Sequence, residues 1–101
     1  MKQNKWIRHG DVILQRVDKI KGIQQRKKET ILAEGEVTGH MHTLTGQILE
    51  SQFENERYIE VEQQAALTHQ EHDTLQIPKG KYQVLLQREV DLLGETRQVM
   101  D

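Results

Sequence analysis

The chain has 101 residues, a formal net charge of −2 at pH 7 and no cysteine, which excludes disulfides and thiolate metal ligands. Apolar residues make up 35% of it and aromatic residues 4%, and this apolar share lies below the roughly 45–50% of typical globular chains. We therefore expect a single domain over residues 1–101 with a small core, and association into a homo-oligomer that buries further apolar surface.

No apolar run approaches the roughly 18 residues that a membrane-spanning helix requires. Residues 1–6 (MKQNKW) lack the apolar segment of a signal peptide. The expectation is a cytoplasmic protein without membrane contact.

Charge is unevenly distributed along the chain. Residues 1–30 carry nine Lys or Arg and three Asp or Glu, whereas residues 31–101 carry five and thirteen. Such asymmetry marks a face for nucleic acid, or it means that the two halves neutralise each other in the fold. We interpret residues 19–29 as a basic surface loop, and the residues that would contact nucleic acid are Lys19, Lys21, Arg26, Lys27 and Lys28.

Short segments with alternating apolar residues predict strands at residues 12–17, 30–33, 40–44, 47–50, 57–62, 74–77 and 82–90. Gly10-Asp11, Thr45-Gly46 and Pro78-Lys79-Gly80 are turn signals between them. Residues 54–67 are also rich in helix formers, but their Tyr, Ile and Val residues favour a strand. Residues 92–101 form a tail that docks or stays flexible. About seven short strands predict an all-β small barrel or sandwich.

The chain has five histidines, four of which form two close pairs. His40 and His42 occur as His-x-His, and on a strand such residues point to the same face. His69 and His72 follow as a second pair, whose spacing places them on opposite faces of a strand unless a turn intervenes. His9 stands alone and is interpreted as an ordinary surface or core residue. Glu34 and Glu36 are interpreted as polar groups of a loop or strand.

Neutral imidazole is a ligand for Zn, Fe, Ni and Cu. We therefore predict a divalent transition metal held by His40 and His42 with His69, His72 or both. Three protein ligands and an open position would suit catalysis. The corresponding reaction is metal-assisted hydrolysis, with His40 and His42 in the catalytic centre and Glu71 as the base.

Two alternatives use the same histidines without a metal. In a ribonuclease or RNA-binding module, a histidine pair acts as general acid and base while the basic loop contacts phosphates. In a non-catalytic interaction module, the histidines bond to Glu34, Glu36, Glu71 or Asp73, and these carboxylates raise the histidine pKa values.

The motifs His9-Gly10-Asp11-Val12, Glu34 to His42 (EGEVTGHMH), His69-Gln70-Glu71-His72, Pro78 to Val84 (PKGKYQV) and Gln87-Arg88-Glu89 occur in this order. The chain thereby resembles a family of small uncharacterised bacterial and phage proteins over about residues 9–91, a resemblance that implies no activity. It is more weakly similar to the cupins, β-barrels with His-x-His and Pro-x-Gly motifs, to which His40, His42, Pro78 and Gly80 correspond. It departs from the cupin pattern at Gln47, where a glutamate is expected, and has no histidine after Gly80.

Overall fold

The computed structural model describes residues 6–34 and 39–87, and within them six strands form one antiparallel sheet. The strands are β1 (Trp6–His9), β2 (Val12–Arg16), β3 (Gln25–Glu34), β4 (Met41–Phe53), β5 (Glu56–Thr68) and β6 (Leu75–Leu86). Their order across the sheet is β1-β2-β6-β5-β4-β3. The all-β prediction is confirmed. The predicted barrel or sandwich of about seven short strands is wrong, because the sheet is open.

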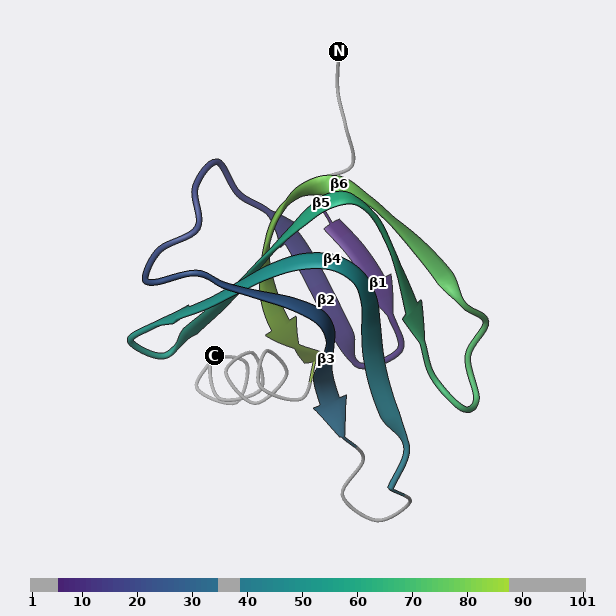
Figure 1. Ribbon diagram of the computed structural model, residues 1–101. Helices are drawn as coiled ribbons and strands as arrows, with labels where there is room; N and C mark the ends of the chain where they lie inside the picture. Colours follow the sequence, from purple (N-terminus) through teal and green to yellow (C-terminus); the bar gives the residue numbers. More distant parts are fainter. Residues whose placement is uncertain (1–5, 35–38, 88–101) are drawn as a thin grey trace, which may run out of the picture.

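Fewer and longer strands result because two predicted turns lie inside continuous strands. Thr45-Gly46 belongs to β4, where the register with β5 shifts between Gly46 and Ile48. A Cβ on Gly46 would lie 2.9 Å from the Ala65 Cβ, so glycine permits a close approach of the two strands at this irregularity. Pro78-Lys79-Gly80 belongs to β6, opposite a register shift in β5. Strands β4, β5 and β6 bend over in an arch (Figure 1).

Two further segments differ from the sequence-based assignment, and in a third the structure resolves the choice between strand and helix. Residues 6–9, for which no strand was predicted, form β1, which pairs with β2 through the predicted turn at Gly10-Asp11. Residues 25–29, assigned to the basic loop, are the first half of β3, so that loop is shorter than predicted. Of the ambiguous residues 54–67, all but the first two lie in strand β5, and none of them forms a helix.

The core lies within the curved sheet. Val12 and Leu14 of β2 are fully buried, as are Ile59 and Val61 of β5, in keeping with the alternation that predicted these strands. Tyr82 is the largest fully buried side chain, and its hydroxyl donates to the Pro78 carbonyl at 2.8 Å. The full cluster comprises Val12, Leu14, Leu32, Ala33, Leu44, Ile48, Ile59, Val61, Ala65, Leu67, Ile77, Tyr82 and Val84.

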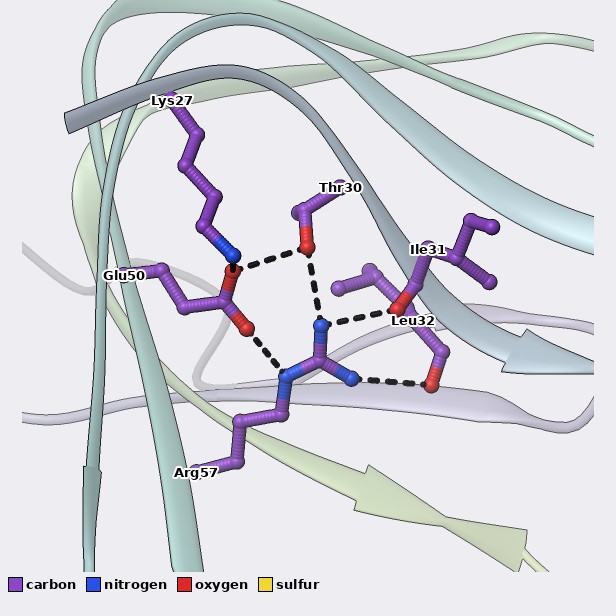
Figure 2. A network of polar contacts seen from close by, with 6 residues as sticks. All are labelled: Lys27, Thr30, Ile31, Leu32, Glu50 and Arg57. Atoms are coloured by element: carbon purple, nitrogen blue, oxygen red, sulfur yellow. Dashed lines mark hydrogen bonds and ion pairs between the residues drawn. The ribbon is translucent and has the colours of Figure 1, made fainter. Parts of the chain in front are cut away.

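Arg57 of β5 connects its own strand to the edge strand β3 (Figure 2). Its guanidinium donates to the carbonyls of Ile31 and Leu32 at 2.7 and 3.3 Å, beside the register shift between Ile31 and Ala33. Arg57 also donates to Thr30 Oγ1 at 3.0 Å and to Glu50 at 2.6 Å. The arginine thus satisfies backbone carbonyls at an irregularity in β3 and holds the two strands together across β4.

Several predictions concern residues outside the described part of the chain, namely Glu36, the tail at 92–101 and the end of the strand predicted at 82–90. Among the residues that are described, no helix is long and apolar enough to cross a membrane.

Candidate histidine site

All five histidines of the chain gather at one end of the sheet. His9 is the last residue of β1, His40 and His42 lie at the start of β4, and His69 and His72 lie in the connection between β5 and β6. The β1–β2 turn, the start of β4 and the β5–β6 connection come together in Figure 1. We call these five residues the histidine cluster.

His42 is the most buried member of the cluster. Its ring centroid lies 4.3 Å from that of His69, 5.1 Å from that of His9 and 5.9 Å from that of His72. His42 is only 4% exposed. His40, the other member of the His-x-His pair, is half-buried at the margin, with its ring 5.5 Å from that of His69.

The second pair, His69 and His72, does converge. Strand β5 ends at Thr68, and the turn that follows allows two residues at this spacing to face the same side. Their ring centroids lie 4.6 Å apart. His69 is half-buried and His72 is exposed, so the cluster reaches solvent on the side of the β5–β6 connection.

Sequence reasoning missed His9, which is 6% exposed and lies within the cluster. The only local signal was its position beside the Gly10-Asp11 turn. That turn places His9 at the end of edge strand β1, but its meeting with β4 depends on the curvature of the whole sheet, which no local pattern reveals.

A chain of hydrogen bonds joins the buried histidines to the backbone. His9 Nε2 lies 2.8 Å from the Asp73 carbonyl oxygen, and His9 Nδ1 lies 3.0 Å from His42 Nδ1. His69 Nδ1 accepts the Glu71 backbone N–H at 3.0 Å. Glu71, predicted as a base, is exposed, and its carboxylate lies 3.4 Å from His40 Nδ1.

Gly10 allows the rings to approach the β1–β2 turn. Its φ is +59°, a conformation that glycine adopts without strain. A Cβ at this position would lie 2.7 Å from His72 Nε2 and 2.9 Å from His42 Cε1. Glycine at position 10 therefore leaves room for both imidazoles.

The environment favours neutral imidazoles. Burial, with the neighbouring charges of His69, His9 and His72, lowers the pKa of His42 to about 4. Burial and the proximity of His72 and His40 also lower the pKa of His69. The raised pKa values expected for an interaction module are therefore not found for these two residues, because burial and the neighbouring histidines outweigh the carboxylates of Asp11 and Glu71.

Three of the five basic residues predicted to contact nucleic acid form ion pairs with glutamates. Lys21 lies 3.8 Å from Glu56, Lys27 lies 3.2 Å from Glu50, and Arg26 forms an ion pair with Glu62. Lys19 and Lys28 are exposed. These pairs follow the alternative in which the basic and acidic halves of the chain neutralise each other.

The fold and the site define a class of protein: a small all-β domain with an open sheet and a buried His9–His42 pair. The chain belongs to the family described as "Domain of unknown function (DUF8820)", which matches residues 8–87 and so spans all five histidines. No curated protein and no solved structure matches the chain. The family resemblance is thus supported at the level of this domain, whereas the open sheet does not support the cupin resemblance.

Proposed function

We propose that the histidine cluster binds a divalent transition metal. The observation that carries the proposal is the convergence of all five histidines, from three separate segments, around the adjacent rings of His42 and His69. An ordinary structural histidine needs one or two polar partners, and it does not require four other imidazoles around it.

The protonation state of the cluster supports this proposal. Because the pKa values of His42 and His69 are lowered, both rings are neutral at pH 7 and retain a nitrogen lone pair. Neutral imidazole suits Zn, Cu, Ni and Fe, whereas Mg and Ca prefer oxygen ligands. The imidazole donors of the cluster therefore favour Zn, Cu, Ni or Fe.

In the described residues, no three His, Asp or Glu side chains surround one point as metal ligands would. The rings are nevertheless adjacent, and the torsion that turns an imidazole has a broad energy profile. The ring centroids of His42, His69 and His72 lie 4.3, 4.6 and 5.9 Å from one another. Rotation of these three rings would turn one nitrogen of each towards a shared ion.

We assign the ligands as His42, His69 and His72, with His40 at the margin. Because His69 Nδ1 accepts the Glu71 N–H, the proton of neutral His69 is on Nε2. Ligation through Nε2 would require this proton to move to Nδ1, and the hydrogen bond from Glu71 would then be lost. An ion with three protein ligands would keep a position open towards solvent beside His72, and it would supply Lewis acidity for hydrolysis there.

The proposal is tested by metal analysis of protein purified without a histidine tag, followed by thermal shift assays with Zn, Ni, Co, Mn and Fe. Free metal at a hundred times its Kd stabilises the fold by about 2.7 kcal/mol, which for a domain of this size raises Tm by about 10–20 °C. His42→Phe should abolish this shift. His40→Phe, the same change two residues away, should reduce it far less.

A metal-to-protein ratio near zero, together with no thermal shift for any of the five metals, would refute the metal site. RNA cleavage or binding that persists in EDTA would instead support the ribonuclease alternative.

A further inference from the structure

We infer that His9 is a positioning residue that fixes the tautomer of His42 and so selects Nε2 as the nitrogen that His42 presents to a ligand. The inference about the tautomer stands on the hydrogen bonds of the buried pair. Its consequence for metal binding rests on the proposed function.

The proton positions follow from the acceptor at the end of the chain. The Asp73 carbonyl oxygen can only accept, so His9 Nε2, 2.8 Å away, must carry a proton. When His9 is neutral, its Nδ1 is then an acceptor. Since His42 Nδ1 lies 3.0 Å from this atom, it must be the donor. A neutral His42 that donates from Nδ1 has its lone pair on Nε2.

The surroundings hold this arrangement in place. His9 and His42 are 6% and 4% exposed, and their rings meet edge to face at an interplanar angle of 81°. In the other tautomer of His42, both Nδ1 atoms would be acceptors and the hydrogen bond between the rings would be lost. Leaving these buried nitrogens unpaired would cost about 1–3 kcal/mol, which disfavours that tautomer. Metal-ligating histidines commonly donate their second N–H to such an outer partner, and that bond fixes the ring's orientation.

The test reads the tautomers of the metal-free protein directly. Long-range ¹H–¹⁵N correlation spectra at pH 7.5 in EDTA distinguish a protonated ring nitrogen from one with a lone pair. We expect His9 in the Nε2–H form and His42 in the Nδ1–H form, which is the less common tautomer of a free histidine side chain. A wild-type spectrum with His42 in the Nε2–H form would overturn the inference.

Two substitutions at position 9 separate positioning from packing. His9→Gln keeps an acceptor and a donor at the end of the side chain, so His42 should remain Nδ1–H. His9→Leu fills space but offers no acceptor, so His42 should change to Nε2–H, and zinc affinity should fall by about 10–100-fold. An unchanged His42 tautomer in folded His9→Leu would count against the inference, and the wild-type spectrum decides the question if that variant does not fold.

The same samples distinguish failure of this inference from failure of the proposed function. The predicted tautomers without zinc binding in calorimetry would support the positioning role of His9 and refute the metal site. Zinc binding with His42 in the Nε2–H form would support the metal site and refute the positioning role of His9.

Discussion

At the scale of single residues, four members of the histidine cluster can be recognised from the sequence and the fifth cannot. The pairs His40/His42 and His69/His72 stand out by their spacing, and the structure brings both into one group. The contribution of His9 could not be predicted, because a lone histidine before a turn is common, and the contact with His42 spans 33 positions along the chain.

Gly10 allows a test at this scale with a matched control. Gly10→Ala should destabilise the protein by about 1–2 kcal/mol through its left-handed backbone alone, and by more because its Cβ would lie 2.7 Å from His72 Nε2. Gly39→Ala has a similar φ of +74°, but no atom of the described residues lies within 4 Å of its Cβ, so we expect the backbone cost alone.

Urea denaturation of both variants checks this prediction. Gly10→Ala should be the less stable of the two, and it should also lose the metal-induced thermal shift. Equal stability of the two variants, or an unaltered shift in Gly10→Ala, would show that the cluster does not need the space beside Gly10.

At the scale of elements, alternation of apolar residues correctly identified β2, the first half of β5 and most of β6, because their inward-facing residues fill the core. It failed where strands bend. Gly46 and Pro78 carry the signature of turns, yet register shifts accommodate them inside β4 and β6. It also failed for the edge strands, since β1 has only four residues and the first half of β3 is exposed and without apolar residues.

Arg57 offers a test of how the irregular edge strand is held. Arg57→Ala would remove hydrogen bonds to the carbonyls of Ile31 and Leu32 and leave the carboxylate of Glu50 without its closest partner. Loss of hydrogen bonds from a charged group predicts destabilisation by about 2–3 kcal/mol.

The control is Arg26→Ala, which removes an ion pair between an exposed side chain and Glu62 and should cost about 1 kcal/mol or less. Both free energies of unfolding come from urea titrations under one set of conditions. If Arg57→Ala costs no more than Arg26→Ala, the network in Figure 2 does not hold β3 in place.

At the scale of the whole molecule, the histidine cluster and the arginine network both join parts of the sheet that are not neighbours in it. The cluster connects β1 with β4 and with the β5–β6 connection, and Arg57 connects β5 with β3. An open sheet is thus held in its curved form by polar contacts as well as by its core, which suits a chain of low apolar content.

Stability of the metal-free protein should consequently fall on acidification. The folded-state pKa of His42, about 4, lies below its usual value of 6.5, so its contribution is complete above pH 6.5 and is lost as pH falls towards 4. The expected loss of stability is on the order of 2 kcal/mol. It is smaller than the pKa shift multiplied by about 1.36 kcal/mol per unit, because solvent reaches the cluster beside His72.

A second loss follows at lower pH. Burial raises the pKa of Glu50, but hydrogen bonds from Thr30 and Arg57 and the charge of Arg57 lower it by more. The pKa of Glu50 therefore lies below its usual value of 4.5. Its contribution is therefore lost as pH falls below about 4.5. Denaturation curves between pH 7.5 and 3.5 should show both losses, and His42→Phe should lack the first. A free energy of unfolding that increases as the pH is lowered from 6.5 to 4.5 would contradict the account of the cluster.

The central claim, that the histidine cluster binds a metal through His42, His69 and His72, is tested most directly by X-ray absorption at the zinc edge of the zinc-loaded, untagged protein. We expect a first shell of nitrogen at about 2.0–2.1 Å with the outer-shell scattering of at least three imidazoles, and loss of that signal in His42→Phe. A spectrum of oxygen ligands with one imidazole or none would show that zinc binds elsewhere on the surface and would contradict the claim.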